Sequence, residues 1–273
     1  MQSTRADITG HMESADTSLD KPESIKRILV VVEPDLLAAD SPLSSALIRR
    51  GLWLARETRA TLELFHVRSD GPTLTHWGHA DRERMNERIE WIDRAATALA
   101  ELAVNLTAES GIAVEHDACW AENHVAAILQ KTAESRADLV LKAADRAGYR
   151  IGLFERPDWA LLRQSPAHVW FVGEKVDAPR HLLAATGDSG EEDSDRIDAV
   201  DDASICAFAD ALRDTCQLRT SILHASDSHA SNSGREADQQ SLAELLEPLA
   251  LDLVSTNFIE GSPRDALPEF AER

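Results

Sequence analysis

The sequence predicts an α/β fold built from two related domains, and two patterns support this prediction. From Lys26 onwards, short apolar runs alternate with longer helix-like segments, an order typical of a parallel sheet with helices on both faces. A strand–helix–strand unit that begins at Ile28 also recurs from His181. A repeat of this length indicates two domains with the same architecture.

The two copies of the repeat share their internal spacing. The equivalent positions in the two helical segments are Leu47, Gly51 and Leu54 in the first copy and Ile205, Ala209 and Leu212 in the second. Residues 121–133 align with 261–273, and nothing in the second copy corresponds to residues 134–172. We therefore expect the second domain to be incomplete at its C-terminal end.

The first domain, residues 26–175, is expected to contain five strands and their connecting helices. Apolar runs predict strands over 28–33, 61–67, 112–118, 138–142 and 168–172. Helices are expected over 42–58, 81–110 and 123–135, and a shorter one is opened by Pro157 and Asp158, which suit the first positions of a helix. Such a doubly wound sheet places its ligand crevice at the carboxyl ends of the first and fourth strands.

The remaining segments have simpler interpretations. The second domain, residues 179–273, is expected to supply strands over 181–186, 219–225 and 252–259. Its loop 188–202 is rich in carboxylates but lacks the spacing of a calcium loop, so it is interpreted as a solvated loop. Residues 1–25 are polar and show no periodicity, which predicts a disordered leader.

Composition limits the classes of function. A formal net charge of -20 opposes binding to nucleic acid and to anionic membranes. No apolar run approaches the roughly 20 residues of a membrane span, and no signal peptide is recognisable. The cysteines, Cys119, Cys206 and Cys216, form neither a metal-type pair nor an even disulfide framework. We expect a cytoplasmic protein that binds neither nucleic acid nor membrane.

The last third of the first domain carries a more specific pattern. The strand Asp138–Lys142 is followed by Arg-Pro-Asp-Trp-Ala-Leu-Leu-Arg at 156–163 and by Pro166, Val169 and Trp170. This pattern resembles the universal stress proteins, in particular their tandem-domain E type. The resemblance implies two Rossmann-like or flavodoxin-like domains that pair with each other, in a cytoplasmic protein of the stress response. A homodimer is a further expectation from this resemblance.

Many members of this superfamily bind ATP through Gly-x-x-Gly, nine residues and Gly-Ser/Thr after the fourth strand, and the first domain departs from this pattern. Lys142 and Ala143 stand where the loop would begin, and Gly148 and Gly152 are four residues apart. Glu155-Arg156 occupies the place of Gly-Ser, where a carboxylate repels phosphate and a Cβ blocks close backbone approach. We expect no ATP in the first domain. An ATP site would require residues beyond Arg273.

The crevice end of the first and fourth strands holds four ligand-binding candidates. Glu33 and Asp35 follow the first strand, where the resemblance implies an aspartate that contacts the adenine or ribose. The favoured interpretation is instead an ion pair between Glu33 and Lys142 that holds the sheet together. Lys142 and Ala143 could alternatively contact a ligand, but no neighbouring nucleophile or acid completes a catalytic set.

Three further candidates are His66 and Val67, which end the predicted second strand, and Trp120, which follows the predicted third strand. His66 and His224 are equivalent in the repeat, which indicates a shared structural role. Trp120 could stack on a ligand ring, although packing in the core is the favoured alternative. Trp159 and Trp170 are expected to pack the fifth strand against its neighbours or the partner domain.

No metal site is expected, since histidine pairs in loops do not supply the three or four converging ligands that zinc requires. The histidines in question are His76, His79, His116 and His124. We therefore expect a non-enzymatic stress-response or small-ligand-binding protein without a certain cofactor. The alternative is an ATP sensor or slow ATPase that works through a completed second domain. A hydrolase related by fold is a third alternative, which depends on analogy alone.

Overall fold

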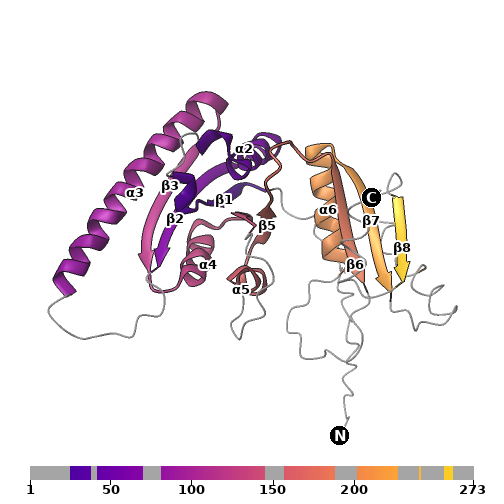
Figure 1. Cartoon of the computed structure of the whole chain (residues 1–273). Coiled ribbons are helices and arrows are strands. Elements are labelled where there is room, and N and C mark those ends of the chain that lie inside the picture. Colours follow the sequence, from indigo (N-terminus) through magenta and orange to yellow (C-terminus); the bar gives the residue numbers. More distant parts are fainter. Residues whose placement is uncertain are drawn as a thin grey trace, which may run out of the picture.

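The computed structural model describes residues 25–37, 42–69, 81–144, 157–187, 202–226, 240 and 255–260 (Figure 1). The segments expected as a leader, as the acidic loop and as the loop after the fourth strand lie outside these residues almost entirely. In the described ranges no helix combines the length and the hydropathy needed to cross a bilayer.

The first domain is built on a five-stranded parallel sheet in the order β3-β2-β1-β4-β5. The strands are β1 (Arg27–Val31), β2 (Thr61–Ser69), β3 (Val114–Ala121), β4 (Leu139–Ala143) and β5 (His168–Val172). In register, Leu29 of β1 lies opposite Glu63 of β2 and Val140 of β4. The predicted α/β fold with five parallel strands is confirmed, and the strand order changes direction between β1 and β4.

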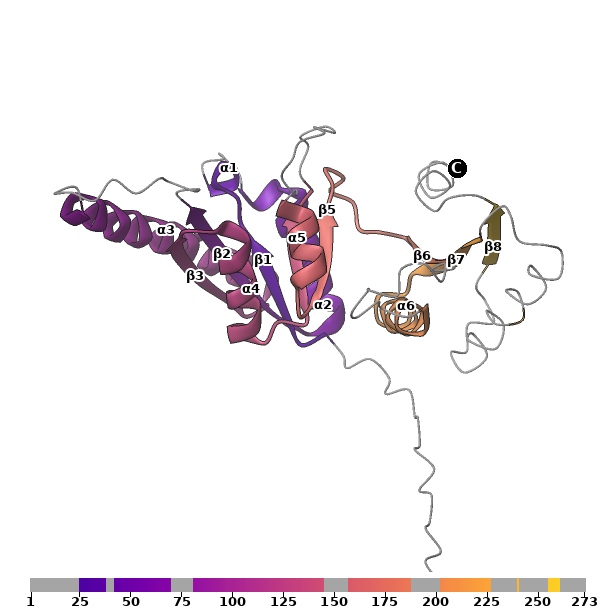
Figure 2. The ribbon, with the colours of Figure 1, turned by 90° about the horizontal axis from the view of Figure 1, so that it is seen from below.

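Helices cover both faces of this sheet (Figure 2). They are α1 (Pro34–Leu37), the 3₁₀ helix η1 (Pro42–Ser44), α2 (Ala46–Thr58), α3 (Asp81–Ser110), α4 (His124–Ser135) and α5 (Pro157–Gln164). Helices α2 and α3 pack on one face, and α4 and α5 pack on the other. The predicted bounds agree with these to within three residues, except that α2 begins at Ala46, four residues after the predicted start; α1 and η1 were not predicted.

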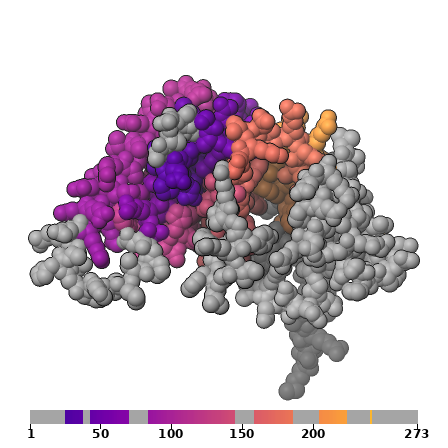
Figure 3. Space-filling view, viewed as in Figure 1, coloured from indigo at the N-terminus to yellow at the C-terminus, as the bar shows by residue number. Residues whose placement is uncertain are grey.

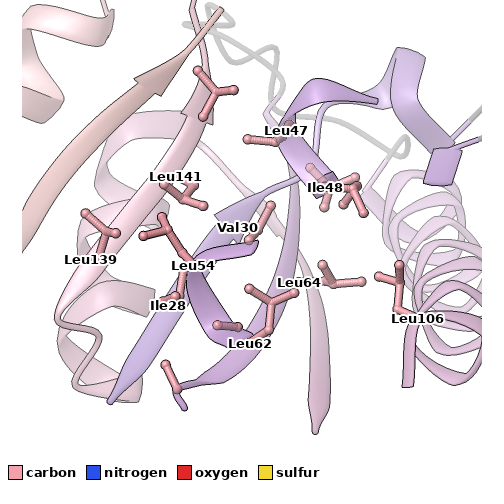
Figure 4. Close-up of a cluster of buried hydrophobic side chains, with 14 of the residues drawn as sticks. Ile28, Val30, Leu47, Ile48, Leu54, Leu62, Leu64, Leu106, Leu139 and Leu141 are labelled. Carbon is pink, nitrogen blue, oxygen red and sulfur yellow. The ribbon is translucent and has the colours of Figure 1, made fainter. Parts of the chain in front are cut away.

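Strand alternation divides the core into two layers. Ile28 and Val30 point towards α2 and α3, while Leu29 and Val31 point towards α4 and α5. All four side chains are fully buried, as expected for a parallel strand covered on both faces. Figure 4 shows the first of these layers, in which leucines of β2 and β4 meet residues of α2 and α3.

The second unit contains a three-stranded parallel sheet in the order β6-β7-β8. Its elements are β6 (His181–Gly187), α6 (Asp202–Cys216), β7 (Arg219–Ser226) and β8 (Ser255–Glu260). The order of these strands is the same as that of β1, β2 and β3 in the first sheet.

Contacts between the two units centre on α2. Leu212 and Cys216 of α6 join the buried cluster beneath α2, and the ring of Phe208 stacks on His168 of β5 with centroids 3.8 Å apart. Arg50 of α2 is 9% exposed and donates a hydrogen bond of 2.9 Å to the carbonyl oxygen of Asp177. Figure 3 shows the segment that leads into β6 lying against the surface of the first domain. One buried guanidinium thus anchors the connecting segment 173–180.

The two family-like tryptophans have different environments. Trp170 is partly buried, and its ring centroid lies 5.5 Å from the guanidinium carbon of Arg50. Trp159, in contrast, is 56% exposed, so the expectation that it packs β5 was wrong. It precedes the buried Leu161 of α5 by two residues, which places the two side chains on opposite sides of the helix.

The close approach of α2 to the sheet depends on Gly51. A Cβ at this position would lie 3.2 Å from Leu62 Cδ1 and 3.2 Å from Val30 Cγ2. We expect Gly51→Leu to lower the free energy of unfolding by about 2 kcal/mol, because the added side chain overpacks a dense core. Urea unfolding followed by tryptophan fluorescence measures this, with Arg49→Leu on the exposed side of α2 as the matched control. Equal loss in both variants would contradict the packing argument.

The anchoring role of Arg50 predicts a local effect on the connecting segment. Arg50→Met should lower stability by about 2 kcal/mol, because the carbonyl of Asp177 loses a charged donor. It should also speed protease cleavage within residues 173–180. Arg50→Lys keeps the charge but cannot lie flat between the rings of Trp53 and Trp170, so cleavage at an intermediate rate is expected. Unchanged cleavage in Arg50→Met would show that the segment is held by other contacts.

Candidate functional site

The candidate site lies where β1 and β4 diverge, at the carboxyl edge of the first sheet. Lys142 is the fourth residue of β4 and lies opposite Val31 of β1. By strand alternation its side chain points to the face covered by α4 and α5. Glu33 follows β1 two residues after Val31, and Asp158 is the second residue of α5. Three different segments therefore bring ionisable groups to one edge of the sheet.

The Lys142 ammonium group is held by three oxygen acceptors. Its Nζ lies 3.2 Å from Oε1 of Glu33 and 3.2 Å from Oδ1 of Asp158. It also donates to the carbonyl oxygen of Ala143 at 3.3 Å. An ammonium group carries three N–H donors, so these contacts can occupy all of them. The ion pair predicted between Glu33 and Lys142 is confirmed, and Asp158 is an additional partner.

The electrostatic environment keeps Lys142 charged. Burial alone would lower its pKa, but the carboxylates of Glu33 and Asp158 outweigh burial and raise the pKa above its ordinary value. A lysine that acts as a general base needs a pKa shift in the opposite direction. Lys142 therefore serves as a fixed positive charge.

His124 is a functional-site residue that sequence reasoning did not place here. It begins α4, whose N-cap Asn123 accepts a hydrogen bond of 3.0 Å from the backbone N–H of Ala126. Burial is the main reason that the pKa of His124 is lowered, and Lys142 lowers it further, while Glu33 opposes the change. The imidazole is thus neutral near pH 7. Its position at the start of the helix after the third strand was the signal that could have found it.

The sequence indicates Asp158 as a helix start and as part of the family-like run 156–163, but its contact with Lys142 was missed. The available signal was its place at the beginning of the helix that follows β4, since such helix starts lie at the carboxyl edge of a parallel sheet. Asp35 lies on α1, where it is exposed. Val67, another candidate, is 2% exposed and belongs to the core layer beneath α4.

His66 and Trp120 lie on the opposite face, beneath α3. His66 is 3% exposed, and its Nδ1 lies 2.6 Å from the carbonyl oxygen of Val32. Burial lowers the pKa of His66, and the hydrogen bond to Val32 partly opposes this. Its ring contacts Trp91 of α3, which in turn meets the ring of Trp120 edge-on at 5.5 Å. The structure thus places Lys142 and Val67 on one face of the sheet and His66 and Trp120 on the other, while Ala143 contributes its carbonyl oxygen to Lys142 and Asp35 lies exposed on α1.

The other residues singled out in the sequence either lie outside the described residues or lie elsewhere in the fold. The glycines after β4, Glu155-Arg156, His76 and His79 lie outside the described residues, as does the side chain of His224. His116 is exposed on β3. The ranges that can be described contain no cluster of metal-ligating side chains.

Two kinds of nucleophilic side chain can be described, the cysteines and a serine in contact with a histidine. The three cysteines are free thiols, and burial raises the pKa of Cys216 to about 11. In the described part of the chain, Nε2 of His181 lies 2.7 Å from Oγ of Ser221. This contact lies near the amino end of β6 and β7, and within the described ranges no carboxylate is bonded to the other ring nitrogen of His181.

Comparison with known proteins connects the first domain to one family. The model of the universal stress protein family matches residues 24–173. A Pseudomonas aeruginosa protein of unknown function is similar with a TM-score of 0.60 and 19% identity, over 91% of this chain and 78% of that one. A universal stress protein from Archaeoglobus fulgidus gives 0.55 and 15%, over 90% and 82%. These identities establish similarity of fold. No curated protein sequence matches the chain.

The ion cluster predicts a dependence of stability on pH. A lysine with a raised pKa stabilises the fold fully below its unfolded pKa of about 10.4 and loses that contribution as pH rises through the folded value. Lys142→Met should therefore remove this loss at alkaline pH. At pH 7 it should cost about 2 kcal/mol, less than for a fully buried pair, because Glu33 is partly solvated.

Urea unfolding from pH 6 to pH 11 measures both effects. The triple variant Lys142→Met, Glu33→Gln, Asp158→Asn is the matched control and should recover most of the stability at pH 7, since no unpaired charge is left. If Lys142→Met alone were as stable as the wild type at pH 7, the cluster would not stabilise the fold.

Proposed function

This chain belongs to the universal stress protein family, and we propose that it is a cytoplasmic, tandem-domain member of the E type that acts without catalysis. In this proposal the protein serves the stress response as a regulatory protein or as a binder of a small molecule. Its first domain does not use the ATP phosphate loop of the superfamily. Its two domains pair with each other, and a homodimer is part of the same proposal.

The contacts of Lys142 are the observation that carries this proposal. A free cation at the switch point could bind a nucleotide phosphate, but this one is already neutralised by Glu33 and Asp158. The group of three is net negative, and neutral His124 adds no positive charge. A triphosphate that approached this edge would meet carboxylates, and like charges at short range are strongly unfavourable. Lys142 and Ala143 also carry a Cβ atom where the family loop would have glycine. These atoms limit how closely a phosphate can approach the backbone.

Support for a non-catalytic role comes from the same geometry. Lys142 is charged and unsuited to act as a base, and burial raises the pKa of the Cys119 and Cys216 thiols, which disfavours the nucleophilic thiolate. Support for domain pairing comes from the contacts of α2 with α6 and from the anchoring of residues 173–180 by Arg50. A small ligand in the crevice would contact Glu33, Asp35 and Ala143 through hydrogen bonds rather than through a phosphate loop.

The full chain provides the test. We expect no saturable binding of magnesium ATP by equilibrium dialysis and no release of phosphate, while a family member that has the complete glycine pattern binds under the same conditions. Native mass spectrometry of protein purified from its own host should reveal either no adduct or a mass that is not a nucleotide. Circular dichroism confirms that the sample is folded.

Two outcomes would change the proposal. Saturable ATP binding would favour the alternative, an ATP sensor that uses the second domain, and phosphate release with a measurable turnover would favour a slow ATPase. The variant Lys142→Gly shows which domain binds ATP. Its affinity for ATP should change if the first domain holds the site and should stay the same if the second domain does.

A further inference from the structure

A cluster of aromatic and cationic side chains lies on the face of the sheet opposite Lys142. Arg68 is the next-to-last residue of β2 and lies in register with Trp120 of β3. The guanidinium carbon of Arg68 is 4.4 Å from the centroid of the Trp120 ring and 6.0 Å from that of Trp91. Trp91 meets Trp120 edge-on, so the two indoles form a rigid base on which the guanidinium lies.

Arg68 retains its capacity to bind an anion. Its side chain is exposed, and it forms no ion pair with any residue that the structure describes. A guanidinium that stacks on a ring uses its flat face, and its five N–H donors lie in its plane. Those donors remain suited to a two-pronged contact with a carboxylate or phosphate.

Two neighbours add to the same chemistry. The guanidinium carbon of Arg88, on α3, lies 5.7 Å from the Trp120 ring centroid and brings a second positive charge to it. The Nε1 of Trp120 is buried and has no hydrogen-bond partner among the described residues. An unsatisfied buried donor costs about 1–3 kcal/mol, and an acceptor atom admitted beside the ring would recover this cost.

We propose that Arg68, together with Arg88 and the indole N–H of Trp120, forms a binding site for a small organic anion whose recognised group is a phosphate or a carboxylate. The site is separate from the crevice at Lys142, because the two lie on opposite faces of the sheet. It therefore does not depend on the function proposed above.

Binding of simple probes to the full chain tests this site. Phenyl phosphate and benzoate represent the two anionic groups, and benzamide is the neutral control. The indole N–H signals of ¹⁵N-labelled protein report binding, and Trp120→Phe identifies the signal of Trp120. We expect saturable shifts of this signal with at least one of the two anions and none with benzamide. The anion that binds more tightly distinguishes a phosphate site from a carboxylate site.

Variants at an exposed position keep the test independent of folding. Arg68→Gln should weaken binding at least tenfold, and Arg68→Lys should weaken it less, since an ammonium keeps the charge but loses the planar contact. Arg49→Gln, at an exposed position of α2, is the matched control and should bind like the wild type. Lys142→Met should also bind like the wild type.

Three results would overturn the proposal. These are shifts that do not saturate, equal shifts with benzamide, and unchanged affinity in Arg68→Gln. Loss of binding in Lys142→Met with retention in Arg68→Gln would place the anion in the crevice and reject the site at Arg68.

Discussion

The charge of Lys142 is the constraint on which the crevice depends. A lysine at the end of a buried strand would be costly if unpaired, because burial disfavours its charged form. Glu33 and Asp158 remove that cost from two directions, and one ammonium group thereby links the end of β1, the end of β4 and the start of α5. The same contacts that stabilise the edge of the sheet occupy the donors that a ligand would need. A ligand that used the ammonium group of Lys142 would therefore have to displace Glu33 or Asp158, each of which lies 3.2 Å from its Nζ.

The two faces of the sheet edge have different chemistry for a simple geometric reason. Successive residues of a strand point to opposite faces, so Val67 enters the layer beneath α4 while His66 and Arg68 point towards α3. The acid–lysine group and the tryptophan–arginine cluster are thus neighbours along the edge but are separated by the sheet. Substitutions on one of these faces leave the packing of the other unchanged. A fold of this kind can therefore accommodate a ligand site outside the crevice at the carboxyl edge.

Local patterns were sufficient to predict the fold of the first domain. Apolar runs such as Ile28–Val32, short, β-branched and alternating with longer helix-like segments, predict buried parallel strands. The spacing of Leu47, Gly51 and Leu54 specifies the face of α2 that meets the sheet. The pairing of Glu33 with Lys142 followed from placing opposite charges at the carboxyl ends of the first and fourth strands, which are neighbours in a doubly wound sheet. Contacts between a helix and a distant strand could not be predicted from these patterns. Trp91 lies within the 30-residue helix α3, and no sequence pattern indicates that it contacts Trp120 of β3. Exposure of Trp159 was missed for a similar reason, since a motif gives residue types but not the direction of one side chain on a short helix.

A small cationic site on a strongly acidic chain is physically consistent, because the two charges act over different distances. At physiological ionic strength the Debye length is about 8 Å, so most of the net charge of -20 is screened from an anion held at Arg68. A guanidinium in direct contact with the anion acts well within that distance. A long polyanion, in contrast, would extend over many surface carboxylates and meet repulsion along its whole length. The charge distribution therefore favours small anions over nucleic acids, and the acidic surface contributes to selectivity rather than opposing the site.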